Sequence, residues 1–247
     1  MDQLDPAVAP PLYVQIATSI AGRIASGELA VGEQLSSERQ LAKELAVSRL
    51  TVRQALLSLR QRGLVDSQVG KGYFVRQPRI EQPIDILIGF SENMLKKGLR
   101  PGATVLTHQT ILADRTLAPM LRIGVGERIF AIHRVRTADA MPVALEYSYF
   151  PARYFPDLDR HDVEQRSIYA ILAEEYGVRL AGAQQALEPV VAQPHQAQLL
   201  DINKGDPLML VTRTAWDAQE RVVEFAQDYY RGDCFRFVSQ SRVQPNE

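Results

Sequence analysis

The chain has 247 residues, of which 46% are hydrophobic and 23% are charged, and its formal net charge is −1. These values are typical of a globular protein, and the length is sufficient for two modest domains. No stretch approaches the roughly 20 apolar residues of a membrane span, and the first residues lack a signal-peptide pattern. The single cysteine, Cys234, excludes an intrachain disulfide and a cysteine-rich zinc site. We therefore expect a cytoplasmic protein with no membrane partner.

Charge is distributed unevenly along the chain. Residues 10–77 contain 9 Lys or Arg against 5 Asp or Glu, whereas residues 78–247 contain 19 against 22. A basic segment followed by a mildly acidic one indicates a domain that meets a polyanion and a second domain with another task.

Three helices are predicted at the start of the chain. Apolar residues recur every fourth position from Leu12 to Ile24, which predicts an amphipathic helix over 12–26. A capping box at Ser37 predicts a second helix, and Ser48 is a good N-cap for a third. The tight connection between the second and third helices is typical of a helix-turn-helix.

The third helix begins with hydroxyl and arginine side chains. Its outer face carries Leu50, Arg53 and Gln54, flanked by Arg49 and Thr51. Arginine can pair with guanine or bind phosphate, glutamine can read adenine, and leucine can contact a thymine methyl group. This helix start is therefore a candidate reader of DNA.

Two short β-type runs follow, separated by Gly70-Lys71-Gly72. This pattern predicts a hairpin whose glycine-rich tip can approach a DNA backbone closely. Three helices and a hairpin form a winged helix-turn-helix. The alternative is a small helical bundle with an ordinary solvated basic face.

Several motifs over residues 10–77 resemble the DNA-binding domain of GntR-family bacterial transcriptional regulators. They include Leu35-Ser36-Ser37-Glu38-Arg39, Val47-Ser48-Arg49, Thr51-Val52-Arg53-Gln54 and Gly70-Lys71-Gly72-Tyr73. The resemblance implies that operator DNA is contacted by Arg39, Ser48, Arg49, Thr51, Arg53, Gly70 and Lys71. Leu50 stands where threonine is common in the family, which is expected to alter base preference, and Ser36 stands where proline is common.

The remainder of the chain predicts an α+β domain with an antiparallel sheet over residues 84–243, after a polar, proline-containing linker at 78–83. The expected helices cover 84–97, 116–122, 167–175 and 194–200. The expected strands cover 104–113, 129–137, 143–150, 183–191, 208–216, 222–230 and 235–243.

Anion-binding chemistry is the clearest signal in this second domain. The four histidines lack metal-ligand spacing, so we expect neither a metal nor a cofactor. Arg134 and Arg136 lie two apart on a predicted strand and share one face, where paired guanidinium groups suit a phosphate. Ser91 and Ser167 lie near predicted helix starts, where free N–H groups attract anions.

Carboxylates and a phenol provide a second group. Glu146 lies on the strand that follows the arginines, and Glu224 and Tyr230 share one strand face. Such groups suit the hydroxyls and amine of a sugar. The alternatives are a salt-bridged strand edge for the arginines, a helix cap for Ser167 and core packing for Tyr230.

Residues 84–243 also resemble the UTRA effector domain, which identifies the chain with the HutC subfamily of GntR regulators. The resemblance is carried by Phe90-Ser91-Glu92-Asn93-Met94, His133-Arg134-Val135-Arg136, Ser167-Ile168-Tyr169 and Tyr230-Arg231-Gly232-Asp233. It implies a fold like that of chorismate lyase, without turnover, and the motifs most resemble amino-sugar-phosphate sensors. It assigns Ser91, Arg134, Arg136 and Ser167 to the phosphate, and Glu146, Tyr169, Glu224 and Tyr230 to the sugar.

These observations predict a homodimeric repressor that binds a palindromic operator on double-stranded DNA and is released by a small phosphorylated sugar. A different small anion, such as a carboxylate, is the alternative effector. A lyase-like enzyme and a nucleoid-type DNA protein without an effector are the other two classes that the sequence leaves open.

Overall fold

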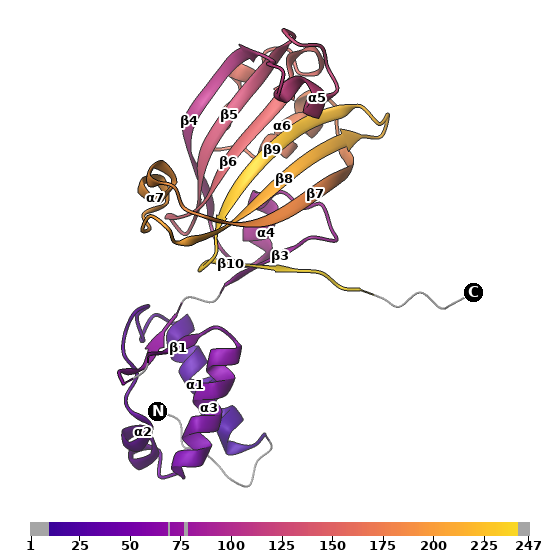
Figure 1. The fold of residues 1–247 in the computed structure, drawn as a ribbon. Helices are drawn as coiled ribbons and strands as arrows, with labels where there is room; N and C mark the ends of the chain where they lie inside the picture. Colours follow the sequence, from indigo (N-terminus) through magenta and orange to yellow (C-terminus); the bar gives the residue numbers. More distant parts are fainter. Residues whose placement is uncertain (1–9, 69, 77–78, 242–247) are drawn as a thin grey trace, which may run out of the picture. The chain divides into compact units, whose positions relative to one another are not determined.

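The computed structural model describes residues 10–68, 70–76 and 79–241, and it divides into two compact units, Met1–Arg79 and Ile80–Glu247 (Figure 1). Each unit has its own hydrophobic clusters. None of the described helices is long and apolar enough to cross a membrane.

The first unit contains helices α1 (Leu12–Ala25), α2 (Glu38–Glu44) and α3 (Arg49–Gln61), followed by strands β1 (Val65–Gln68) and β2 (Gly72–Val75). The two strands form an antiparallel hairpin. Ser37 and Ser48 cap α2 and α3, since their side chains accept hydrogen bonds from the backbone N–H groups of Gln40 and Thr51. The predicted winged helix-turn-helix is confirmed.

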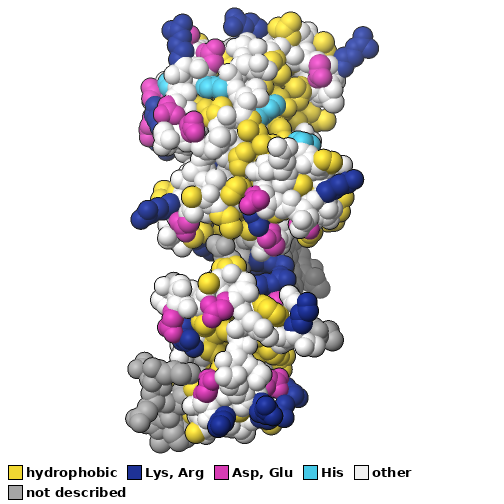
Figure 2. All heavy atoms as spheres, turned by 90° about the vertical axis from the view of Figure 1, so that its left-hand side faces the viewer, with side chains coloured by type: hydrophobic (Ala, Val, Ile, Leu, Met, Phe, Trp, Pro, Cys, Tyr) yellow, Lys and Arg dark blue, Asp and Glu magenta, His cyan; other side chains and the backbone are white. Residues whose placement is uncertain are grey.

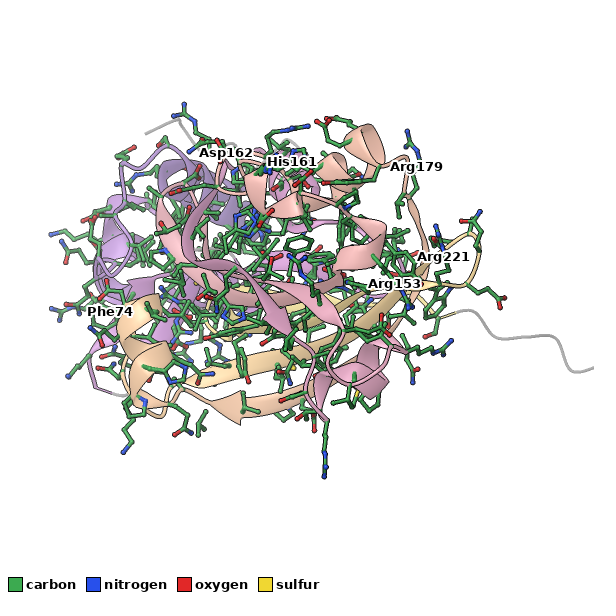
Figure 3. All side chains as sticks on the ribbon, turned by 90° about the horizontal axis from the view of Figure 1, so that it is seen from above. Phe74, Arg153, His161, Asp162, Arg179 and Arg221 are labelled. Atoms are coloured by element: carbon green, nitrogen blue, oxygen red, sulfur yellow. The ribbon has the colours of Figure 1, made fainter. Side chains whose placement is uncertain are left out.

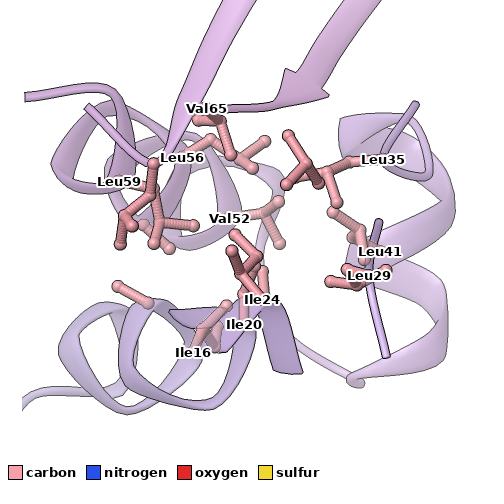
Figure 4. Packing of buried hydrophobic residues seen from close by; sticks show 14 of the residues in the cluster. Ile16, Ile20, Ile24, Leu29, Leu35, Leu41, Val52, Leu56, Leu59 and Val65 are labelled. Atoms are coloured by element: carbon pink, nitrogen blue, oxygen red, sulfur yellow. The ribbon is translucent and has the colours of Figure 1, made fainter. Parts of the chain in front are cut away.

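The core of this unit is entirely apolar (Figure 4). The isoleucines of α1 that recur every fourth residue, among them Ile16 and Ile20, pack against α3. Val52, Leu56 and Leu59 of α3 are fully buried. Burying each side chain of this size stabilises the fold by about 1.5–3 kcal/mol. This burial fixes which face of α3 points inward, and the opposite face is therefore held at the surface.

The second unit is built on a six-stranded antiparallel sheet with the strand order β4-β5-β6-β9-β8-β7. The predicted α+β class with an antiparallel sheet is therefore confirmed. The strands are β4 (Pro101–Leu112), β5 (Arg128–Ala138), β6 (Met141–Pro151), β7 (Leu180–Val191), β8 (Pro207–Asp217) and β9 (Val222–Arg231).

Helices and a small parallel strand pair complete this unit. The α-helices are α4 (Phe90–Lys96), α5 (Leu117–Leu121), α6 (Ile168–Glu175) and α7 (Pro194–Leu200), and short 3-10 helices cover Ala152–Tyr154 and Leu158–Arg160. Strands β3 (Ile80–Pro83) and β10 (Phe235–Val238) pair in parallel. The large sheet carries the cavity described below on one face.

Three predicted segments differ from the structure. Residues 80–83, predicted as linker, form β3, because their backbone pairs with a strand some 150 residues away that no local pattern reveals. The helix predicted over 84–97 begins only at Phe90, because the apolar residues 86–89 line a cavity in place of a helical turn. The predicted last strand ends at Val238, and residues 242–243 lie outside the described chain.

Candidate functional site

The outer face of α3 is open to solvent. The side chains of Arg49 and Arg53 are 64% and 55% exposed, and Leu50 is 64% exposed although it is apolar. Ser48 and Thr51 are tied together at the helix start, with 2.8 Å between their hydroxyl oxygens. The residues predicted to read DNA from α3 therefore stand on one accessible helix start.

Glu38 at the start of α2 holds the arginines of α3. Arg53 donates to both of its carboxylate oxygens, from Nε at 3.2 Å and from Nη2 at 3.1 Å. Arg49 Nη2 lies 3.8 Å from the same carboxylate. Because Glu38 is mostly buried while the arginines are exposed, the carboxylate restricts where the two guanidinium groups can point.

The hairpin of β1 and β2 places a basic tip at the surface. Gly70 and Gly72 have φ of 76° and 97°, a left-handed conformation that favours glycine. Lys71 between them is exposed, and its carbonyl accepts a hydrogen bond from the amide of Gln34. Arg39 is also exposed, on α2. Each DNA-contact residue predicted from the sequence is at least partly accessible in this unit.

The second unit contains a cavity of about 690 Å³ of empty space, part of which is open to solvent. Its floor is one face of the sheet, and residues 86–91 and the start of α6 complete its wall. Seven of the eight predicted effector residues line it: Ser91, Arg134, Arg136, Glu146, Ser167, Tyr169 and Tyr230. The eighth, Glu224, is fully buried next to Tyr169.

The arginines of the cavity differ from those of the periphery. Arg179 and Arg221 project outward at the edge of the fold (Figure 3), whereas Arg134 and Arg136 have side chains only 2% and 5% exposed. A buried charge is costly unless it is paired, so these two arginines require partners inside the protein.

Glu146 is the shared partner of both arginines. Arg134 Nη2 donates to its two oxygens at 2.9 and 2.8 Å, and Arg136 Nη1 donates to Oε2 at 3.1 Å. Burial alone would raise the pKa of Glu146, but the two arginines outweigh burial and lower the pKa to about 2. Two cations thus share one anion, which leaves this end of the cavity positive.

Further contacts orient the two guanidinium groups. Arg134 Nη1 donates to the carbonyl of Val163 at 2.6 Å, and its Nε is buried without a hydrogen-bond partner in the described part of the chain. Arg136 Nη2 donates to the hydroxyl of Ser91 at 2.9 Å, and its guanidinium lies 4.3 Å from the centre of the Phe90 ring. Ser167, the N-cap of α6, makes no capping hydrogen bond and lines the cavity.

A second buried cluster lies toward β8 and β9. Arg213 Nε donates to Glu224 at 3.1 Å, and its Nη1 donates to Asp228 Oδ2 at 3.1 Å. The hydroxyl of Tyr169 donates to Glu224 at 2.8 Å. One cation here meets two carboxyl groups, so this end of the cavity has the opposite balance from the Arg134 end.

Ionisation differs sharply between the carboxyl groups. Burial raises the pKa of Asp228 to about 7, with Arg213 opposing the rise and Glu146 and Glu224 adding to it. Burial also raises the pKa of Tyr169 and of Tyr230, so both phenols remain neutral donors.

Among the described residues, no group of three or more His, Cys, Asp or Glu side chains is arranged to hold a metal ion.

Sequence reasoning missed several contributors to this region, among them Arg213, Asp228, Gln185 and the apolar segment 86–89. A signal for Asp228 was present, because residues 224, 226, 228 and 230 have the same parity on one strand and must share a face. Arg213 gave no comparable signal, since both of its partners, Glu224 and Asp228, lie on the neighbouring strand β9 and are found only once the register of the two strands is known.

Comparison with known families accounts for both units. Residues 12–75 match the bacterial regulatory proteins of the GntR family, and residues 96–236 match the UTRA domain. The chain belongs to the GntR family. It combines the helix-turn-helix and UTRA domains of the HutC type, so it is a DNA-binding transcriptional regulator and not a lyase-like enzyme.

Individual relatives cover nearly the whole chain. The HTH-type transcriptional repressor NagR of Bacillus subtilis is 36% identical over 92% of this chain and 93% of its own length. The mannosyl-D-glycerate transport/metabolism system repressor MngR of Escherichia coli is 32% identical over 92% and 95%. The crystal structure of PhnF from Mycobacterium smegmatis has a TM-score of 0.79 at 27% identity and covers 93% of this chain and all of its own.

Proposed function

We propose that this protein is a homodimeric transcriptional repressor that binds a palindromic operator and is released from it by a small phosphorylated sugar, with an amino-sugar phosphate favoured. Helix-turn-helix proteins read palindromes as symmetric dimers, with one recognition helix in each half-site. In this chain the side chains Arg49 and Arg53 would meet base edges or phosphates, and Lys71 at the hairpin tip would meet flanking backbone.

The observation that carries the effector proposal is the shared carboxylate of the buried arginines. Arg134 and Arg136 have Glu146 as their one carboxylate partner among the described residues, so a charge deficit of one anion remains at that end of the cavity. A phosphate accepts several forked hydrogen bonds from such groups. The hydroxyls of Ser91 and Ser167 and the first N–H groups of the eight-residue helix α6 line the same region.

The opposite end of the cavity is suited to a ligand group that is polar and either uncharged or cationic. Asp228, Tyr230 and Gln185 line it, and the local charges of Arg213, Glu224 and Asp228 do not favour a second anion. A molecule with an anionic end and a hydroxyl or amine end fits this polarity, and a sugar phosphate has that form.

The relatives' names mention several different molecules, two of which are sugar derivatives. They mention mannosyl-D-glycerate, fructoselysine and histidine utilisation. The first of these contains a carboxylate as its anion, so a carboxylate effector is the second candidate for the arginine pair.

Thermal-shift measurements separate the two candidates, since a ligand that binds the folded state raises Tm. We expect glucosamine 6-phosphate to stabilise the protein, free glucosamine and gluconate to do so much less, and Arg136→Gln to abolish the shift. Arg153→Gln, which changes an arginine 46% exposed at the surface, is the control and should keep the shift. Stabilisation by gluconate but not by sugar phosphates would favour the carboxylate effector.

A further inference from the structure

Two polar atoms of the residues that line the cavity have no hydrogen-bond partner among the described residues: Arg134 Nε, which is a donor, and Asp228 Oδ1, which can accept. Asp228 Oδ2 accepts from Arg213, but Oδ1 is buried and makes no hydrogen bond to any residue that the structure describes. Both oxygens of Glu146, the other carboxyl group among the described lining residues, are occupied. A buried acceptor without a partner is costly, and in native proteins it commonly marks a place where a ligand or a proton is received.

Strand register explains how Asp228 comes to be in this position. Asp228 on β9 lies directly opposite Glu146 on β6, and Glu146 lies opposite Arg134 on β5. Two like charges directly opposite each other repel, and this repulsion adds to the effect of burial in favouring a proton on one of the two carboxyl groups. Glu146 is held ionised by two arginines, whereas Asp228 has only the contact with Arg213, which Glu224 shares.

The same register sets the distance between the two ends of a ligand. Neighbouring strands lie about 4.8 Å apart, so β9 is roughly 10 Å from β5 across the cavity floor. A ligand whose anion contacts Arg134 and Arg136 therefore places its other end near Asp228. The carboxyl torsion of aspartate is broad and nearly two-fold, so Oδ1 can turn toward that group.

We infer that Asp228 receives the polar group at the non-phosphate end of the effector, and that the proton on its carboxyl decides between a hydroxyl and an ammonium group there. This inference rests on the proposed function. A neutral hydroxyl is bound by the protonated acid, which donates to the hydroxyl oxygen. An ammonium group is bound by the carboxylate, and the acid proton leaves to solvent when that ligand binds.

The groups around Asp228 set the pH range of this selection. Glu146 on β6, Arg213 on β8, Glu224 and Tyr230 on β9 and Tyr169 on α6 all interact with it electrostatically. With the pKa of Asp228 near 7, the acid is mostly protonated below neutral pH and mostly ionised above it. Selection between the two ligand types should therefore change with pH in this range.

The test compares glucosamine 6-phosphate with glucose 6-phosphate, which differ by an amine in place of a hydroxyl. Dissociation constants are measured with the full-length protein by calorimetry from about pH 6 to about pH 7.5. We expect the preference for the amine to rise with pH, by up to about tenfold per unit, because one proton is exchanged. The phosphate ionises in both ligands, so its contribution cancels in the ratio.

Asp228→Asn removes the exchangeable proton and keeps an oxygen for Arg213, so its ratio should not change with pH. Asp233→Asn changes an aspartate 55% exposed, paired with Arg231, and should behave like the unmodified protein. Proton release on amine binding, measured in two buffers of different ionisation enthalpy, tests the same inference without a variant.

Two negative results have different meanings. If both probes bind and their ratio is independent of pH, or if Asp228→Asn leaves a pH-dependent ratio unchanged, the role of Asp228 is wrong while the proposed effector class stands. If neither probe binds the unmodified protein, the proposed effector class is wrong and the inference fails with it.

Discussion

The two units of this protein place their arginines in opposite environments. In the first unit Arg49 and Arg53 are more than half exposed, and the core beneath them is apolar. In the second unit Arg134 and Arg136 are almost completely buried and depend on Glu146. The ion pairs of Arg49 and Arg53 with Glu38 are partly solvated, so these arginines can meet DNA at little cost in stability. A buried pair can select a small anion, but changes to it also change the stability of the protein.

The largest expected effect is on stability in the second unit. Arg134→Ala leaves Glu146 without its two-oxygen partner and opens space in the core, so we expect a loss of about 3–5 kcal/mol in the free energy of unfolding. Denaturant titration measures it. A loss below about 1 kcal/mol would contradict the account of Arg134 as a buried, paired charge.

The matching change in the first unit is Arg49→Ala. Since this side chain is exposed, its removal should change the free energy of unfolding by no more than about 0.5 kcal/mol, and operator binding should weaken by about 1–3 kcal/mol if it contacts a base. Fluorescence anisotropy with operator DNA measures the second quantity. Undiminished operator binding in both Arg49→Ala and Arg53→Ala would exclude α3 as the recognition helix.

The pH dependence of stability provides a third test of the buried unit. The pKa of Asp228 is raised in the folded state to about 7, so the folded protein holds a proton that the unfolded chain has released above about pH 4. Stability from this group is therefore complete below that pH and is lost as pH rises toward 7, by at most about 1.4 kcal/mol per unit. In Asp228→Asn this dependence of the free energy of unfolding on pH should be absent. If the variant and the unmodified protein show the same dependence, the pKa of Asp228 is not raised in the folded state.

Glu38→Gln should produce only a small change in the free energy of unfolding, since partly exposed ion pairs contribute about 0.2–1 kcal/mol. Its effect on DNA binding has a distinct form. A carboxylate close to bound DNA repels the phosphate backbone, so its loss should strengthen binding to non-specific DNA. Because the substitution also releases Arg53, the ratio of operator affinity to non-specific affinity should fall. If that ratio is unchanged, Glu38 has only a structural role.

Local patterns predicted much of this structure. The four-residue spacing of isoleucines gave α1, and the residues 194–200 predicted as a helix are the observed α7. Alternation along a strand placed Arg134 and Arg136 on one face of β5, and the structure brings them together at one carboxylate. These features depend on neighbours within a few residues.

What the sequence did not reveal depends on distant partners. The pairing of Ile80–Pro83 with Phe235–Val238 joins segments at opposite ends of the unit. The ion pairs of Arg213 require β8 and β9 to be in register. The raised pKa of Asp228 comes first from burial and then from nearby charges, among them Glu146, which lies opposite it on a strand far away in sequence.

The central claim is that the cavity of the second unit controls DNA binding by the first, and one coupled titration tests it most directly. Operator affinity is measured with and without saturating glucosamine 6-phosphate, and ligand affinity is measured with and without operator. We predict that the ligand weakens operator binding and that the operator weakens ligand binding by the same factor, because coupling is reciprocal. Tight ligand binding that leaves operator affinity unchanged would contradict the claim.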